Sequence, residues 1–417
     1  MELEGMDAWL SIVGVGEDGM SGLSAASRAA LAQAEVVMGA RRHLALVGTS
    51  LAGTVERLEW PVPFEAGVAQ VLALRGRRVV VLASGDPFWF GAGTVLARRL
   101  PPGEWRAWPA PSTFSLAAAQ LGWALEHTTC IGLHAAPFAR LRPLLAQGRR
   151  LLVLVRDGEA AGALVQWLSE RGFGDTRVHV LEALGGPRQR VRSVQAAGGL
   201  PPDVGHPVVL GLEVSLAQPR PLPEAEAAPP VVMPCTSGLD DRFFAHDGQI
   251  TKRPLRALTL SALAPRAGEL LWDIGAGSGS IGIEWLLADP ANRAVAFEAD
   301  RLRAARARDN AVALGVAHLQ VVEGRAPQVL AGQPLPDAVF IGGGLSQALL
   351  DSLWACLPPG ARVVANAVTL ESEALLGQWH AQCGGQLLRV ELSEAAPLGR
   401  RRGWKAAYPV VQWSVSR

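Results

Sequence analysis

Short apolar runs alternate with stretches of helical periodicity along most of the chain. In the first half these runs are residues 10–15, 79–83, 151–155, 178–181 and 208–212, and in the second half they are residues 269–273, 294–298, 319–323, 337–341 and 361–366. The alternation predicts βαβ units with parallel sheets, so the expected fold class is α/β. The runs of the second half are too apolar for a sheet face in water. We therefore predict a doubly wound, Rossmann-like domain with helices on both faces of its sheet.

Two proline-containing segments divide the chain. Residues 217–234 (AQPRPLPEAEAAPPVVMP) contain six prolines, which remove backbone donors and interrupt periodicity, so we interpret them as a linker. A second break around residues 99–114 splits the first half into two lobes. The predicted domains are residues 1–216, with lobes of about 1–108 and 109–216, and residues 235–417. A cleft between the two lobes is the expected ligand site.

Composition narrows the expected partners. Of 417 residues 49% are apolar, and the 39 basic residues nearly balance the 38 acidic ones, so neither nucleic acid nor a membrane surface is expected to bind. The four cysteines are scattered and the eight histidines lack metal-ligand spacing, so we expect no metal and a reducing, cytoplasmic location. An acidic N-terminus and the lack of a long apolar run give no sign of targeting elsewhere.

The sharper of two glycine-rich loops follows the first apolar run of the second half. It spans residues 273–280 (DIGAGSGS) and precedes a helical stretch. Glycines let the backbone turn tightly and let a ligand approach without meeting a Cβ atom. Glu298 ends the next apolar run, in the right place to accept hydrogen bonds from two ribose hydroxyls. Loop and acid together predict a nucleoside-binding site.

The spacing of the glycines separates two nucleoside cofactors. Dinucleotide-binding folds use G-x-G-x-x-G, whereas Gly275, Gly277 and Gly279 are spaced G-x-G-x-G behind the acid Asp273. An acid there repels a pyrophosphate but suits a cationic amino-acid cofactor. The arrangement resembles the class I S-adenosylmethionine methyltransferases. Residues 340–344 (FIGGG) lack the Pro-Pro-aromatic motif of nucleic-acid amino-methylases, so a flipped base is not the expected substrate.

The first half also carries a glycine loop, residues 14–19 (GVGEDG), which matches G-x-G-x-x-G literally. Glu17 and Asp18 put negative charge where a pyrophosphate would lie, and the helical run begins only after Ser24. A dinucleotide site is therefore not predicted.

Three segments of the first half resemble, in order and spacing, the signatures of the tetrapyrrole (class III) methyltransferases: residues 9–24 (WLSIVGVGEDGMSGLS), 79–93 (VVVLASGDPFWFGAG) and 110–123 (APSTFSLAAAQLGW). The resemblance covers residues 9–215 and implies a folded S-adenosylmethionine bound between two lobes. Residues 156–158 (RDG) and 181–190 (LEALGGPRQR) indicate the cobalamin-pathway branch that methylates ring carbon 5. The family loop is usually G-x-G-P-G, and here Glu17-Asp18 replaces the proline.

The second half is similar to the partner enzymes that methylate carbon 15 and decarboxylate the acetate on carbon 12. The segments that carry this resemblance are residues 250–263 (ITKRPLRALTLSAL), 271–286 (LWDIGAGSGSIGIEWL), 297–316 (FEADRLRAARARDNAVALGV), 323–330 (EGRAPQVL), 340–344 (FIGGG) and 364–372 (VANAVTLES). Both halves in one chain resemble the bifunctional precorrin methyltransferase family, which takes precorrin-6B to precorrin-8. One S-adenosylmethionine per half, a tetrapyrrole substrate and a homo-oligomer are implied.

The resemblance also assigns site residues. In the second half it places the cofactor against Thr251, Gly275, Ala276, Gly277, Ser278, Gly279, Glu298 and Ala326. In the first half the corresponding residues are Gly14, Gly16, Ser84, Gly85, Asp86, Trp89, Ser115, Arg156 and Leu184. Doubly wound folds place substrate at the carboxyl ends of their strands, which makes candidates of Gly342, Gly343, Gly344, Asn366 and Glu371. The sequence assigns no catalytic acid or base.

Two alternatives stay open. One half could lack catalysis and act as a scaffold, and the altered loop makes the first half the candidate. Alternatively, the chain could methylate another tetrapyrrole, an RNA or another small molecule, since both folds host such enzymes. The near-zero net charge speaks against RNA.

Overall fold

The computed structural model describes residues 8–48, 51, 53–216 and 231–417. They form two compact units, one from the described residues of Met1–Ala136 and Ala146–Pro219 and the other from those of Pro137–Leu145 and Arg220–Arg417. Residues 217–230 of the predicted linker lie outside the described residues, and the domain boundaries given above stay predictions. Along the described ranges, no helix combines the length and the apolar character that crossing a membrane requires.

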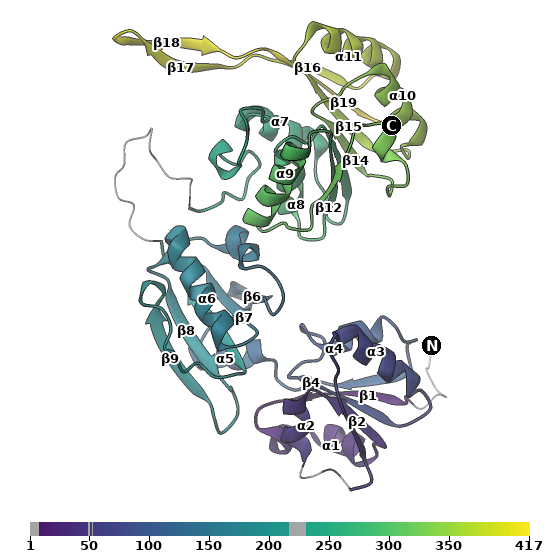
Figure 1. Cartoon of the computed structure of the whole chain (residues 1–417), viewed down its shortest axis with the longest axis vertical. Helices are drawn as coiled ribbons and strands as arrows, with labels where there is room; N and C mark the ends of the chain where they lie inside the picture. The colour runs from purple at the N-terminus through teal and green to yellow at the C-terminus, as the bar shows by residue number, and fades with distance from the viewer. Residues whose placement is uncertain (1–7, 49–50, 52, 217–230) are drawn as a thin grey trace. The chain divides into compact units, whose positions relative to one another are not determined.

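The first unit begins with a parallel sheet of strand order β3-β2-β4-β1-β5 (Figure 1). Its strands are β1 (Leu10–Val15), β2 (Val36–Gly39), β3 (Glu56–Glu59), β4 (Val79–Ser84) and β5 (Trp105–Trp108). The helices between them are α1 (Ala25–Ala32), α2 (Arg41–Val47), α3 (Phe64–Ala73) and α4 (Ala92–Ala97). Successive residues of β1 enter separate apolar clusters on the two sheet faces, Ile12 in one and Val13 in the other. This lobe confirms the βαβ prediction.

A second sheet of the same unit has the order β6-β7-β10-β8-β9. Its strands are β6 (Thr128–Gly132), β7 (Arg150–Leu154), β8 (Arg177–Glu182), β9 (Arg190–Gln195) and β10 (Val208–Glu213), with helices α5 (Thr113–Leu121) and α6 (Gly158–Leu168). The prediction of a parallel sheet was wrong here, because β10 is antiparallel to β7 and β8, and β9 is antiparallel to β8. After the crossover through α6, the short connection from β8 to β9 joins two antiparallel strands, and β10 then lies between β7 and β8 and runs opposite to both.

The second unit is built on a seven-stranded sheet of order β13-β12-β11-β14-β15-β19-β16. Its strands are β11 (Leu270–Ile274), β12 (Arg293–Glu298), β13 (Gln320–Glu323), β14 (Ala338–Ile341), β15 (Arg362–Ala367), β16 (Gln386–Val390) and β19 (Val410–Ser416). The five strands predicted from the sequence are mutually parallel, whereas β19 runs antiparallel to β15 and β16.

Helices cover both faces of this sheet, as predicted. They are α7 (Arg253–Leu263), α8 (Ser280–Ala288), α9 (Arg301–Ala313), α10 (Gln347–Cys356) and α11 (Leu370–Cys383). Leu271 packs into a cluster with α7, α8 and α9, while its neighbour Trp272 packs into the cluster of α10 and α11. Alternate side chains of a strand point to opposite faces, so the buried strand β11, which is apolar except for Asp273, contributes to two cores at once.

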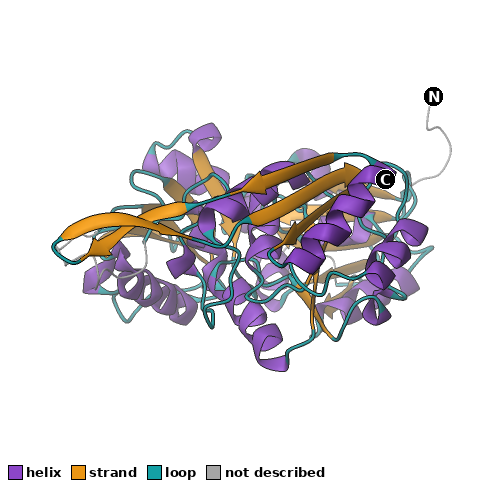
Figure 2. Cartoon of the chain, turned by 90° about the horizontal axis from the view of Figure 1, so that it is seen from above, coloured by secondary structure: helices purple, strands orange, loops and turns teal. Residues whose placement is uncertain are grey.

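The sequence did not predict the hairpin of β17 (Ser393–Leu398) and β18 (Arg401–Ala406). Its two strands, orange in Figure 2, extend away from the sheet of their own unit. Leu398 and Trp404 are 70% and 79% exposed. The residues of this hairpin lack an apolar alternation that faces a core, which is why the pattern gave no strand signal.

Candidate functional site

Each unit contains a cavity at the edge where its parallel strands end. The cavity of the first unit has a volume of about 670 Å³ and is lined by residues that follow β1, β2 and β4, together with residues of β7, β8 and β10. The cavity of the second unit has a volume of about 750 Å³ and is lined by residues that end or follow β11 to β15. The carboxyl edge of parallel strands is where α/β folds bind ligands, so both cavities are candidate sites.

In the second cavity the glycine loop joins β11 to α8 with all three glycines in the left-handed region. The φ angles of Gly275, Gly277 and Gly279 are 72°, 57° and 76°, which residues with a Cβ atom adopt at a cost. A Cβ on Gly275 would lie 2.6 Å from the Cα of Gly343. The loops after β11 and β14 therefore touch backbone to backbone, and together they form one side of the cavity.

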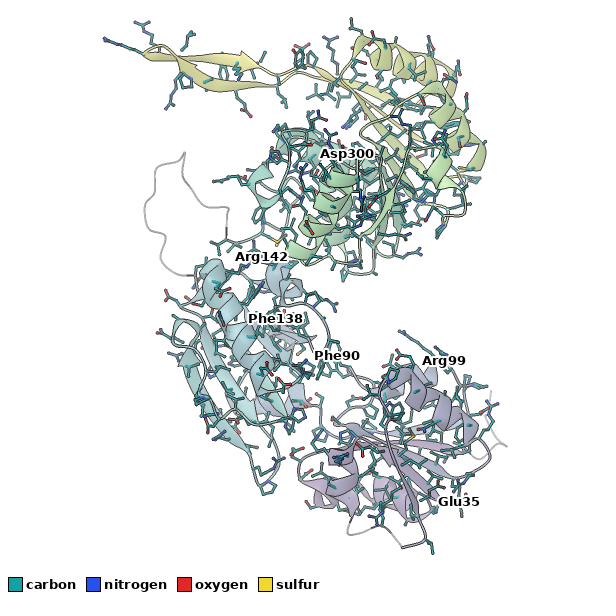
Figure 3. All side chains as sticks on the ribbon, viewed as in Figure 1. Glu35, Phe90, Arg99, Phe138, Arg142 and Asp300 are labelled. Carbon is teal, nitrogen blue, oxygen red and sulfur yellow. The ribbon has the colours of Figure 1, made fainter. Side chains whose placement is uncertain are left out.

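Glu298, at the end of β12, is held beside this loop by two backbone groups. One carboxylate oxygen accepts a hydrogen bond from the N–H of Gly277 at 2.7 Å, and the other accepts one from the N–H of Asp300 at 2.9 Å. The residue is 7% exposed and lines the cavity. Each carboxylate oxygen has two lone pairs, so both can accept a further bond from vicinal hydroxyls. Asp300, labelled in Figure 3, also caps α9.

Asp273 lies in β11 behind the loop and is buried. The N–H of Gly282 in α8 donates to its carboxylate at 2.9 Å. Burial raises the pKa of Asp273 to about 7. The nearby Glu298 carboxylate contributes to this rise, whereas the hydrogen bond from Gly282 lowers the pKa. Asp273 is not among the residues that line the cavity. The sequence led us to expect this acid beside the ligand, whereas the structure places it where it ties α8 to β11.

A buried polar network fixes Asn366, which lies in β15 and lines the same cavity. Its amide nitrogen donates to the hydroxyl of Thr259 at 3.0 Å, and its amide oxygen accepts from Gln412 at 3.0 Å. Gln412 also donates to Thr259 at 3.1 Å. Because these bonds fix which end of the amide is oxygen, Asn366 presents a defined polar group at the cavity. Val368 and Tyr408, which are exposed, add apolar surface to its lining.

The first cavity has an aromatic side. Trp89 and Phe90 belong to the connection between β4 and α4, and Phe90 is labelled in Figure 3. Their rings lie 5.0 Å and 5.9 Å, centroid to centroid, from the ring of Phe114 in α5. Val62 is almost fully exposed at the same lining. This surface can hold a flat, largely apolar ligand.

The other side of the first cavity is polar. Glu17 follows β1, Arg42 and His43 begin α2, and Ser84 ends β4. The Arg42 guanidinium donates to the Ser84 hydroxyl at 2.7 Å and to Nε2 of His43 at 3.0 Å. Burial, and secondly the Arg42 cation, lower the pKa of His43 to about 4. The imidazole is therefore neutral near pH 7, and burial likewise lowers the pKa of His206 in the same lining.

Most of the predicted site residues meet at these cavities. Those lining the second cavity are Thr251, Gly275, Ala276, Gly277, Ser278, Glu298, Ala326, Gly342, Gly343, Gly344 and Asn366. Those lining the first are Gly16, Ser84, Gly85, Asp86, Trp89 and Leu184. Residues far apart in sequence are thus brought together in each unit, and their roles as ligand contacts stay predictions.

Five predicted residues lie outside both linings: Gly14, Ser115, Arg156, Gly279 and Glu371. Gly14 lies within β1, where a Cβ would meet the carbonyl of Gly85. The hydroxyl of Ser115 is bonded to that of Ser112, and Arg156 pairs with Asp157. Gly279 caps α8, and Glu371 lies in the first turn of α11. Packing and capping account for these positions, and their role as ligand contacts stays a prediction.

Sequence reasoning missed Arg42, His43 and Phe90 in the first cavity and Tyr408 in the second. Arg42 and His43 follow the strand β2 almost directly, so a prediction of that strand would have placed them at the carboxyl edge. Tyr408 precedes β19, a strand that the sequence pattern did not predict, and no local signal marks it.

Comparisons with known proteins agree with this two-part organisation. The family described as "Tetrapyrrole (Corrin/Porphyrin) Methylases" matches residues 10–197, and the family described as "Precorrin methyltransferase domain" matches residues 242–417. A solved structure, the C-terminal domain of precorrin-6Y C5,15-methyltransferase from Rhodobacter capsulatus, is 57% identical, with a TM-score of 0.43, and covers 44% of this chain and 100% of its own.

Two curated relatives extend over nearly the whole chain. The precorrin-6Y C(5,15)-methyltransferase [decarboxylating] of Sinorhizobium sp is 49% identical and covers 98% of this chain and 96% of its own. The protein of the same name from Mycobacterium tuberculosis is 41% identical and covers 97% and 99%. Identity at this level over both full lengths shows common descent of the whole two-part chain. The chain therefore belongs to the family of the decarboxylating precorrin-6Y C(5,15)-methyltransferases.

Proposed function

We propose that the chain methylates precorrin-6B twice with S-adenosylmethionine, at ring carbon 5 in the first unit and at carbon 15 in the second. The second unit also removes the carboxyl group of the acetate on carbon 12, which gives precorrin-8 in cobalamin biosynthesis. Family membership supports the reaction. The observation that carries its division between two sites is the presence of a separate cavity at the carboxyl edge of each unit.

The lining of the second cavity fits S-adenosylmethionine. The carboxylate of Glu298 can accept from both ribose hydroxyls, and the glycine loop admits a ligand against its backbone. Ala276 and Ala326 add small apolar surface for a base. We assign the cofactor to these residues, to Thr251 and to the loop from Gly275 to Gly279. In the first unit we assign it to the residues that line the cavity beside Trp89 and Leu184.

For methyl transfer the protein has mainly to align the cofactor with the substrate. Bound S-adenosylmethionine supplies an electrophilic methyl group on a sulfonium. The cavity walls hold the nucleophilic ring carbon in line with it and exclude water, which accounts for about 7–11 kcal/mol of barrier lowering in well-oriented reactions. Apolar residues such as Trp89 and Phe90 in one cavity and Val368 in the other suit this task. We expect no metal ion in either step.

Decarboxylation requires the substrate carboxylate to lose its solvation. The bond between the side-chain carbon and the carboxylate breaks, carbon dioxide leaves, and the electron pair passes into the conjugated ring before a proton replaces the lost group. Apolar lining residues such as Val368 and Val410 raise the free energy of a carboxylate placed against them. Lys252 and Arg325 line the same cavity and can hold the other carboxylates of the substrate. Gly342, Gly343, Gly344 and Asn366 are the proposed substrate wall.

A single incubation tests the proposed function. The full chain is given precorrin-6B and S-adenosylmethionine with a labelled methyl group, and the product is analysed by mass spectrometry and carbon NMR. We expect two labelled methyl groups, at carbons 5 and 15, and loss of one carbon dioxide. A product with a single methyl group would favour the alternative in which one unit is a scaffold. Turnover of another tetrapyrrole in place of precorrin-6B would contradict the substrate assignment. We further expect two cofactors per chain, a homo-oligomer and a cytoplasmic location.

A further inference from the structure

Glu17 stands in the loop after β1, where the tetrapyrrole methylases usually have proline, and it is one of the buried charged residues of the first unit. The residue is 8% exposed. A carboxylate out of water is costly unless it is paired. Its surroundings therefore show what Glu17 does in the altered loop.

Two arginines from different lobes bind the two carboxylate oxygens of Glu17. Arg42, at the start of α2 beside the first sheet, donates to Oε1. Arg188, in the connection between β8 and β9 of the second sheet, donates to Oε2 at 2.8 Å. The carboxylate is thus a bridge between the two lobes of the unit.

The backbone closes around the same contact. A Cβ on Gly186 would lie 2.5 Å from the Cβ of Glu17 and 2.8 Å from its carbonyl oxygen. The connection that carries Arg188 is itself ordered by a hydrogen bond from the N–H of Gly185 to the side chain of Gln189 at 2.8 Å. Glu17 therefore packs against the backbone of an ordered turn as well as binding Arg188. Leu184 of the same turn lines the cavity.

The bridge also fixes the polar wall of the cavity. Arg42 is always a donor, so its bond to Nε2 of His43 requires that nitrogen to be unprotonated. The Ser84 hydroxyl accepts from Arg42 at 2.7 Å, and its oxygen lies 2.8 Å from the same imidazole nitrogen. Glu17 holds the other end of the Arg42 guanidinium, so the wall depends on a residue that reaches into the second lobe.

We propose that Glu17 is a positioning residue for the reaction of the first unit, which joins the two lobes through Arg42 and Arg188 and so sets the width and the polar wall of the cavity. This inference rests on the proposed function. Glu17 acts through the two arginines and not on the reacting atoms. The altered loop is thus a working part of the first site and not a sign of lost catalysis.

The test uses the full chain, whose second unit serves as an internal control. Glu17→Gln keeps the shape and removes the charge. We expect methylation at carbon 5 to fall about tenfold in kcat/KM, because hydrogen bonds to a charged group are worth about that factor, while methylation at carbon 15 is unchanged. Glu59→Gln is the matched control, since this carboxylate also lies at the carboxyl edge of the first sheet and pairs with an arginine, but on the surface. It should change neither rate.

A double-mutant cycle separates positioning from mere stability. Arg188→Gln removes the exposed arm of the bridge, so the variant should fold, and it should lower the carbon 5 rate severalfold. In the Glu17→Gln background it should add less than twofold, because its partner is already absent. Additive effects, or an unchanged carbon 5 rate in folded Glu17→Gln, would overturn the proposal.

Hydrogen exchange and calorimetry supply readouts besides activity. In Glu17→Gln the peptide that contains residues 184–190 should exchange faster, and cofactor binding should weaken about tenfold at one site of the chain only. If the wild-type chain does not methylate carbon 5 at all, the proposed function fails, while these two measurements still decide whether Glu17 holds the lobes together. If hydrogen exchange of residues 184–190 and cofactor binding are both unchanged in Glu17→Gln, the positioning role is contradicted.

Discussion

The two cavities of this chain are built by different means. The second is formed by backbone: a loop of three left-handed glycines, pressed against Gly343, with Glu298 bonded to one of its N–H groups. The first is formed by side chains from both of its lobes, with aromatic rings on one side and the network of Glu17, Arg42 and His43 on the other.

This difference explains why the glycine loop of the second site can be predicted from the spacing of its residues, whereas the polar network of the first site is seen only in the structure. The glycine loop lies in one contiguous stretch of sequence, and the spacing of its glycines predicts where the backbone turns. A side-chain site is assembled from residues such as Glu17 and Arg188, which lie far apart in sequence and each look like an ordinary surface charge. The two sites should therefore respond differently to pH, to loss of charge and to loss of apolar surface.

The largest expected effect is a pH dependence of the stability of the second unit. The folded-state pKa of Asp273 is raised from 3.8 to about 7, so between these values the folded protein binds more protons than the unfolded one, and stability falls as pH rises. At about 1.4 kcal/mol per pKa unit, the loss reaches about 4 kcal/mol above pH 7. Asp273→Asn should abolish this part of the dependence. Calorimetry of both proteins between pH 5 and 8 checks it, and parallel curves would contradict it.

The first unit should show the opposite sign through His43. Its pKa is lowered from 6.5 to about 4, so the unfolded protein binds more protons between these values, and stability falls as pH falls, by about 3 kcal/mol at pH 4. His43→Gln should flatten this dependence without altering that of Asp273. If the variant and the wild type lose the same stability between pH 7 and 4, the buried neutral imidazole is not its source.

The parts of the fold that could be predicted are those marked by a local sequence pattern. The strands β11 to β15 were predicted because each carries a short apolar run, and the glycine loop marks where the first of them ends. The antiparallel place of β10 and the strands β16 to β19 were not predicted. Strand direction depends on which connection crosses the sheet, and the exposed strands of the hairpin carry no core-facing pattern. Arg42 and His43 were missed because β2 was missed.

Next in size is the effect of Glu298→Ala. The change removes the proposed acceptor for the ribose hydroxyls and the bond that holds Gly277, so we expect cofactor affinity at the second site to fall about a hundredfold, as loss of two charge-assisted hydrogen bonds implies. Glu323→Ala is the control, because Glu323 is the register partner of Glu298 on β13 but pairs with Arg308 instead. Titration calorimetry should then show one weakened and one intact site in Glu298→Ala, and two intact sites in the control. If the affinity of the second site is the same in Glu298→Ala as in the wild type, the ribose role of Glu298 is refuted.

The smallest expected effect tests the aromatic side of the first cavity. Trp89 lines the cavity and packs at 5.0 Å against Phe114, so Trp89→Ala removes a flat wall while leaving the polar network intact. Loss of an aromatic contact and its buried area should weaken ligand binding about tenfold. We expect this in the KM for carbon 5 methylation, with the carbon 15 rate unchanged. Trp404→Ala on the exposed hairpin is the control and should alter neither. If Trp89→Ala lowers kcat and leaves KM alone, the ring orients the reacting groups instead of contributing binding energy, and the first site then depends on alignment at both of its walls.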